Sequence, residues 1–239
     1  MGDISDLEES IQFHKEALEL RPAPHSHRSD SLSNLALALS TKFGQRGDLN
    51  DLEVSITYLD EALQLLPSYH PHQTYLNHHH GMMLMVLHSQ TAQEAYLDNA
   101  MNSFRLAMEC RSSPVLDQFH VGKTWVDYAH SSHPSAMEAY QCTIKLLPRL
   151  AALGMELKTC QKALSHFDGL ASNAASCAIG LGELEKAVEL LEHGRGVFWS
   201  QSLRLRTPLD DLHSVAPTLA QKLHNLADAL EMGSLRDAS

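Results

Sequence analysis

Small and apolar residues recur along this chain at helical spacing, and the pattern itself repeats. The segment GDISDLEESIQFHKEALELRP, residues 2–22, returns as GDLNDLEVSITYLDEALQLLP, residues 47–67, without a gap and at an offset of 45 residues. Both copies carry mostly apolar or small residues at i, i+4, i+7 and i+8, which form one face of an α-helix. A proline ends each copy, where a helix has to stop. The pattern predicts two equivalent helices.

A second periodic segment precedes the later copies of this helix. These segments are SLSNLALALSTKF, residues 31–43, and LNHHHGMMLMVLH, residues 76–88. Two helices per repeat, joined in the first case by the Gly-Asp turn at 47–48, cannot bury their faces alone and have to stack on the next pair. We therefore expect an all-α fold, an α-solenoid of about ten to twelve helices with no sheet and with a C-terminal capping helix.

The spacing of the second helices resembles the tetratricopeptide repeat, TPR, whose pattern runs from a small residue through a bulky residue and alanine to proline. The matching sets are Ser10, His14, Ala17, Pro22; Ser55, Leu59, Ala62, Pro67; Ala100, Phe104, Ala107, Ser112; Ala136, Tyr140, Thr143, Pro148; and Ala187, Leu191, Gly194, Trp199. In the first helices, Leu32, Leu35, Ala36 and Leu39 match the core positions of the family, and Gly81 falls where Ala36 does. The resemblance implies a right-handed α-solenoid, although the period exceeds the ~34 residues of the standard repeat.

Two further segments resemble one particular group of TPR proteins. AVELLEHGRGVFWSQSLRLRTPLDDL, residues 187–212, and HPSAMEAYQCTIKLLPRLAALG, residues 133–154, are similar to the helical arm of fungal TPR–CHAT proteins. In those proteins a caspase-like CHAT domain follows the arm and carries the reactive His and Cys. The resemblance implies that this chain is the non-catalytic arm, a protein-interaction scaffold that in relatives precedes and regulates the CHAT domain.

The repeats also suggest how the chain is organised. We expect TPR-like repeats over 1–148, an extra helix and a final TPR-like unit over 149–200, and a linker with a C-terminal amphipathic helix over 201–239. The extra helix falls within 149–167 and the terminal helix within about 214–232. Residues 6–21 form a second helix without its first, so the N-terminal unit is interpreted as incomplete, in a fragment or truncated copy of a longer repeat protein.

Composition narrows the class of partner. The chain carries a formal net charge of −11, which argues against a nucleic-acid partner. The longest apolar run, MMLMVL, is far shorter than the ~20 residues of a membrane span, and the acidic N-terminus is no signal peptide. The four cysteines, Cys110, Cys142, Cys160 and Cys177, lack CxxC pairing and are interpreted as reduced, which indicates an intracellular, cytoplasmic location.

Few residues suggest chemistry. The run HHH at 78–80, with three further histidines nearby, invites a metal site, but metal ligands on a helix want i, i+3 or i+4 partners and this helix has none. GLGELEK, residues 180–186, lacks the third glycine of a phosphate loop. We predict no cofactor and no metal. The alternative to the scaffold is a cysteine hydrolase that pairs Cys142 or Cys160 with a histidine brought close by the fold.

Binding residues are expected on the concave face, where the first helices line the groove of a solenoid. The residues beside the packing positions are Asn34, Leu37, Thr41, His78, Met82 and Met85. We expect them to hold a protein or peptide. Arg195, Trp199, Arg204 and Arg206 form either the end of the last solenoid helix or a docking element, and the two interpretations are compatible. In a longer form, a CHAT domain is the second expected partner.

Overall fold

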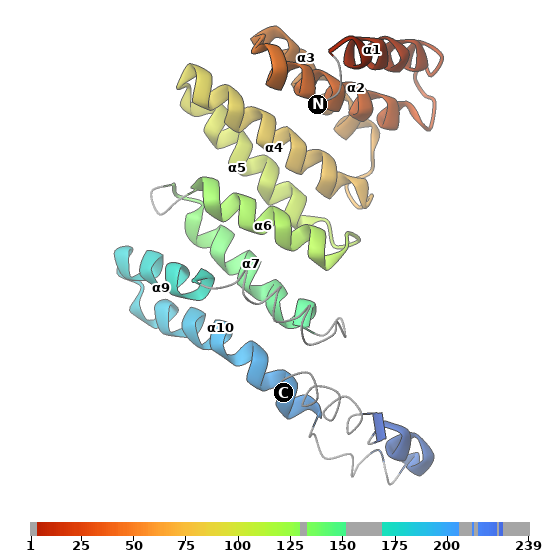
Figure 1. The fold of residues 1–239 in the computed structure, drawn as a ribbon. Helices are drawn as coiled ribbons and strands as arrows, with labels where there is room; N and C mark the ends of the chain where they lie inside the picture. Colours follow the sequence, from red (N-terminus) through yellow and green to blue (C-terminus); the bar gives the residue numbers. More distant parts are fainter. Residues whose placement is uncertain are drawn as a thin grey trace. The chain divides into compact units, whose positions relative to one another are not determined.

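The computed structural model describes residues 4–129, 133–151, 169–205, 212, 215–223 and 225–226. Within these ranges every regular element is a helix and no strand occurs, which confirms the all-α prediction (Figure 1). The helices are α1 (Ile4–Glu19), α2 (Arg28–Arg46), α3 (Leu49–Leu65), α4 (His72–Thr91), α5 (Glu94–Glu109), α6 (Val115–Ala129), α7 (Ala136–Ala151), α9 (Leu170–Gly180) and α10 (Leu184–Leu205). The chain divides into two units, Met1–Ala139 and Tyr140–Ser239.

In the first unit, each helix packs on its neighbours in sequence. The turn between α2 and α3 shows why. Gly47 adopts a left-handed conformation with φ of 73° and donates its N–H to the Phe43 carbonyl at 2.7 Å, which ends α2. The Asp48 carboxylate then accepts from Asn50 N–H at 3.0 Å and caps the start of α3. The predicted Gly-Asp turn is confirmed.

The sequence offset of 45 residues reappears in the hydrogen bonds of the first unit. One long polar side chain near the start of α2, α4 and α6 donates to a carbonyl at the end of the helix before it. The three bonds are Arg28 Nη1 to Arg21 O at 3.0 Å, Gln73 Nε2 to Leu66 O at 3.0 Å and Gln118 Nε2 to Cys110 O at 2.7 Å. They satisfy carbonyls that a helix end leaves without partners.

A second repeated bond joins the two helices within each hairpin, α2 to α3 and α4 to α5. The neighbouring hydroxyls, Ser29 Oγ and Thr74 Oγ1, donate to the buried carbonyls of Ala62 and Ala107 at 3.2 Å and 2.8 Å. The chain therefore repeats in its polar contacts as well as in its apolar spacing.

The small and bulky positions identified in the sequence form the core of this unit. Ser55, Leu59 and Ala62 of α3 are buried, and so are Ala100, Phe104 and Ala107 of α5. Gly81 lies against the ring of Phe104 on α5, and a Cβ there would lie 2.6 Å from Cε1 of that ring. Only glycine leaves room for that ring.

The second unit contains the rest of α7 and the hairpin of α9 and α10. Gly182, with φ of +78°, lies in the turn between the two helices, and small residues bring them close together. Ala174, Ala175, Ala178 and Ala187 are buried there, and a Cβ at Gly194 would clash with Ala171. The helix α7 continues through Pro148 to Ala151.

Two helices expected in this unit are only partly visible. Of the extra helix predicted within 149–167, residues 152–167 lie outside the described residues. Of the terminal helix predicted at about 214–232, residues 217–223 are helical, and residues 227–232 lie outside the description.

Candidate functional site

A hollow of about 1170 Å³ opens in the first unit between α3 and α5, with α4 as its floor. Each helix contributes one stripe of residues at helical spacing. The stripes are Ile56, Asp60, Leu63 and Gln64 from α3; Gln73, Asn77, His80 and Leu84 from α4; and Tyr96, Asn99, Asn102, Ser103, Leu106 and Glu109 from α5. Tyr69 and the segment Cys110–Ser112 close one end. The lining combines carboxamides, leucines and few charges.

His80 links the two walls of this hollow across its floor. Its Nδ1 lies 2.8 Å from Ser103 Oγ on α5, and its Nε2 lies 3.2 Å from Asp60 Oδ1 on α3. Ser103 Oγ also donates to the Asn99 carbonyl at 2.9 Å, so its proton is already committed to its own helix. The Ser103 hydroxyl and the Asp60 carboxylate therefore face His80 from opposite walls, one at each ring nitrogen.

The three residues therefore act as a tie between helices rather than as a hydrolytic triad. A serine nucleophile has to give its proton to a neutral imidazole and face a pair of free N–H donors. Ser103 is 4% exposed and sits in the middle of α5, where the surrounding N–H groups belong to the helix ladder. The Asp60 side chain is about half exposed, at 53%, and only Oδ1 faces the imidazole.

The carboxamides of the hollow fall into two groups. Asn77 is buried and its Nδ2 donates to both the carbonyl and Oε1 of Gln73 at 2.9 Å, so it belongs to the fold. Asn99 and Asn102 are exposed on α5, and within the described residues neither side chain has a hydrogen-bond partner. Leu106, on the same face, is 45% exposed. These groups can take a ligand.

Cys110 lies at the closed end of the hollow and is buried. Burial alone raises the pKa of its thiol, but hydrogen bonds with Ser112, Ser113 and Thr74 outweigh it and hold that pKa below its usual value. Its Sγ also donates to the His70 carbonyl at 3.3 Å. From the sequence, Cys110 was interpreted only as one of four reduced thiols.

The cysteines of the hydrolase alternative lie elsewhere. Cys142 is half-buried on α7, and Cys160 falls outside the described residues. At Cys177, burial first and then Glu183 raise the pKa of the thiol, which disfavours a reactive thiolate there.

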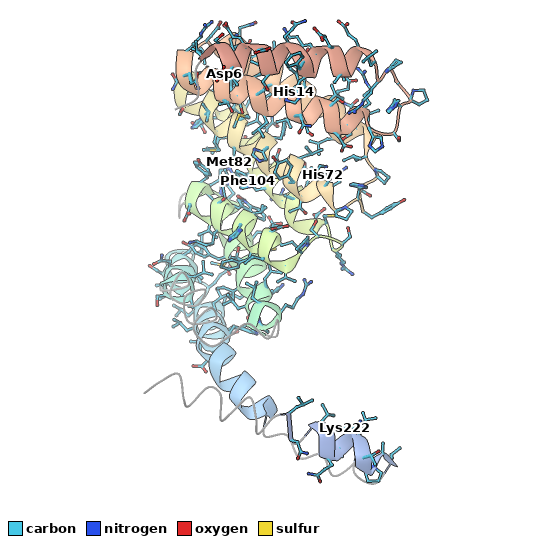
Figure 2. All side chains as sticks on the ribbon, turned by 45° about the vertical axis from the view of Figure 1, so that its right-hand side comes forward. Asp6, His14, His72, Met82, Phe104 and Lys222 are labelled. Atoms are coloured by element: carbon cyan, nitrogen blue, oxygen red, sulfur yellow. The ribbon has the colours of Figure 1, made fainter. Side chains whose placement is uncertain are left out.

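The six residues predicted to line a groove lie on the first helices of the repeats. Asn34, Leu37 and Thr41 are exposed on α2, whereas His78, Met82 and Met85 are half-buried on α4. Figure 2 shows Met82 and, nearer the start of the same helix, His72. Leu37 lines a small hollow of about 10 Å³ with Tyr75 and His79, and none of the six lines the large hollow.

His78 has a packing role in this arrangement. Its Nε2 lies 3.2 Å from Thr124 Oγ1 of α6, and its ring lies 6.0 Å from the Phe104 ring. Burial, and after it the neighbouring His79 and His120, lower the pKa of His78 to about 4. A neutral imidazole therefore holds α4 against α6.

The predicted C-terminal docking residues cannot be placed at side-chain level. The backbone of Arg195, Trp199 and Arg204 belongs to α10, while their side chains and all of Arg206 lie outside the described residues. In the described part of the chain, no cluster of three or more His, Cys, Asp or Glu is arranged to hold a metal ion. None of the helices searched there is both long and apolar enough to cross a membrane.

Comparing the two copies in the sequence marks polar positions that line the hollow, although it does not reveal the hollow itself. At the offset of 45 residues, Leu35 becomes His80, Val54 becomes Asn99 and Tyr58 becomes Ser103. Each change replaces an apolar or aromatic side chain by a polar one at a helix-facing position. Helical periodicity does not detect these replacements, because they appear only when the residues of the two copies are compared one by one.

Two comparisons with known proteins were informative only in finding no match. A scan against protein-family models finds none that matches the chain, and a search of curated proteins finds no match either.

Proposed function

We propose that this protein is a non-catalytic protein-interaction scaffold, a TPR-like right-handed α-solenoid arm. Its partner-binding site is the hollow between α3, α4 and α5. The observation that carries the proposal is the lining of that hollow. Asn99 and Asn102 offer donors and acceptors that have no hydrogen-bond partner in the described part of the chain, beside the partly exposed Leu106. A peptide presents the same combination of main-chain polar groups and apolar side chains.

The size of the hollow also favours a peptide segment. Its 1170 Å³ exceeds the ~300–1,000 Å³ typical of pockets for small ligands. The hollow is open along its length, since α3 and α5 form separate walls above α4. A chain segment can therefore lie along the hollow and continue beyond the end opposite Tyr69 and Cys110–Ser112.

The wider role follows from the resemblance of residues 133–154 and 187–212 to TPR–CHAT arms. In a longer form, the arm would carry a caspase-like domain and control it when a partner occupies the hollow. Buried thiols at Cys110 and Cys177 suit a reducing compartment, and we place the protein in the cytoplasm.

The test is a selection of random 12-residue peptides on the full chain, followed by fluorescence anisotropy of the enriched peptides. Two matched variants locate the site: Leu106→Glu in the hollow and Leu37→Glu on α2, whose leucines are 45% and 41% exposed. We expect Leu106→Glu to weaken binding at least about tenfold, because it buries an unpaired charge against an apolar ligand group, and Leu37→Glu to change it little.

The opposite pattern would move the site to the face predicted from the sequence, with Asn34, Leu37 and Thr41. A selection that enriches no binding peptide would overturn the scaffold.

A further inference from the structure

We propose that the hollow between α3 and α5 binds an extended segment carrying a lysine or arginine, with its main chain on Asn99 and Asn102 and its basic side chain on Asp60. This inference rests on the proposed function and specifies the chemistry of the partner. The observations behind it are the Asn99 and Asn102 carboxamides on one wall and the half-exposed Asp60 carboxylate on the other.

The α5 wall favours an extended ligand over a helical one. Asn99 and Asn102 are three residues apart on α5, about 4.5 Å along the helix axis, and within the described residues both carboxamides lack partners. A carboxamide pairs with a peptide group through one donor and one acceptor. The main chain of a helix has already satisfied these groups internally, so only an extended segment can use both asparagines.

The α3 wall favours a basic side chain. Asp60 uses Oδ1 toward His80, and no other partner of its carboxylate occurs within the described residues. Glu109 adds a second exposed carboxylate on the opposite wall, and Arg111 is the cationic side chain at the closed end. Among these three side chains two carboxylates stand against one guanidinium, so their charges sum to a net negative value.

The repeat shows that this negative charge is a feature of the second copy. Lys15 of α1 occupies the position equivalent to Asp60, so the charge at this place is reversed between the copies. The whole chain, with a net charge of −11, attracts basic segments before they dock.

The experiment selects the same random 12-residue library on the parent and on Asp60→Lys. The substitution copies the residue of the first repeat at a half-exposed position, so the fold should tolerate it. Asp98→Lys is the matched control, because Asp98 also pairs with a histidine, His133, at 3.3 Å and lies outside the hollow. Only peptides whose binding is lost in Leu106→Glu are counted.

We expect lysine and arginine to be enriched among parent and Asp98→Lys binders, and glutamate and aspartate among Asp60→Lys binders. For a single basic peptide, Asp60→Asn should weaken binding about two- to fivefold at low salt, the range of a half-exposed ion pair. Asn99→Ala and Asn102→Ala should each weaken it about two- to tenfold by removing main-chain hydrogen bonds, with Asn34→Ala as the exposed control.

Equal peptide compositions on the parent and Asp60→Lys would overturn the basic ligand while the scaffold stands. A helical bound peptide, seen by transferred nuclear Overhauser effects, would overturn the extended mode. If no peptide depends on Leu106, this inference fails, and the scaffold survives only where another face binds.

Discussion

The hairpins α2–α3 and α4–α5 occupy equivalent places in the repeat, yet their contacts differ in size and polarity. Ala36 faces Leu59 in the first hairpin, and the equivalent pair in the second is Gly81 and Phe104. A larger residue on one helix is matched by a smaller one on the other. The total volume at the contact is therefore conserved, as close packing requires.

The contacts toward the preceding helix show the opposite behaviour. Leu35, with Ile11, Ala38 and Leu39, forms a filled apolar cluster against which Val54 and Tyr58 also pack. At the equivalent places of the second hairpin, His80, Asn99 and Ser103 line the hollow. Within a hairpin, the two copies keep the same total side-chain volume at the helix contact. Between hairpins, the first copy fills the space and the second leaves a hollow. The comparison teaches that the polar surface available to a partner arises between hairpins.

The largest expected effect concerns the contact inside a hairpin, where Gly81 lies against Phe104. Gly81→Leu should lower the free energy of unfolding by about 3 kcal/mol or more, because its side chain would enter the space of the Phe104 ring. Urea denaturation measures the change. The smaller substitution Gly81→Ala should be partly rescued by Phe104→Leu, which recreates the Ala36–Leu59 pair of the first hairpin.

Additive effects of Gly81→Ala and Phe104→Leu would show that the two positions do not share one space. The exchange of volume between the copies would then be coincidental.

The second prediction exchanges the equivalent residues Leu35 of the filled cluster and His80 of the hollow. Leu35→His should cost about 3 kcal/mol, because a fully buried leucine is lost and an imidazole is left without partners among apolar neighbours. The reverse change, His80→Leu, should alter stability by less than about 1 kcal/mol, since it removes a tie to a half-exposed carboxylate. Similar losses in both variants would mean that the hollow is as tightly packed as the cluster.

These two contacts also show which features could be predicted from the sequence and which could not. Periodicity predicted the helices, and the repeat pattern predicted that Ala62, Leu59 and Gly81 would lie where helices touch, because helical spacing directly fixes which residues share a face. It placed the binding residues on α2 and α4 by analogy with solenoid grooves. The hollow depends on which neighbouring side chains fail to fill a space, and this requires three-dimensional packing.

The third prediction uses a titrating residue found in one copy alone. Above pH 6.5, His78 is neutral in both the folded and the unfolded chain. Because burial lowers its folded pKa to about 4, the unfolded chain takes up a proton first as the pH falls. Stability should therefore decrease between pH 6.5 and pH 4, by about 2 kcal/mol after allowance for the half-exposed ring.

The first copy carries Ser33 at the position of His78, which supplies the variant. His78→Ser should flatten this part of the pH profile, measured as melting temperature against pH, while the values at pH 8 stay comparable. His79, whose pKa burial also lowers, will leave a residual slope. Parallel profiles of parent and variant would show that His78 is hydrated in the folded chain.

The smallest effect is expected at the turns, where the second copy has lost the capping residues of the first. Ala92 adopts the left-handed conformation with φ of 54°, in place of Gly47, and Gln93 makes no side-chain cap, in place of Asp48. Ala92→Gly with Gln93→Asp should stabilise the protein by about 1 kcal/mol, because glycine relieves the backbone strain and aspartate caps α5. The exchange Gly47→Ala with Asp48→Gln should cost a similar amount. Thermal unfolding of both double variants measures these changes in stability.

A loss of stability in Ala92→Gly with Gln93→Asp would contradict this prediction. It would mean that His88, whose Nδ1 lies 3.0 Å from the Gln93 carbonyl, depends on the present turn and already compensates for the missing cap.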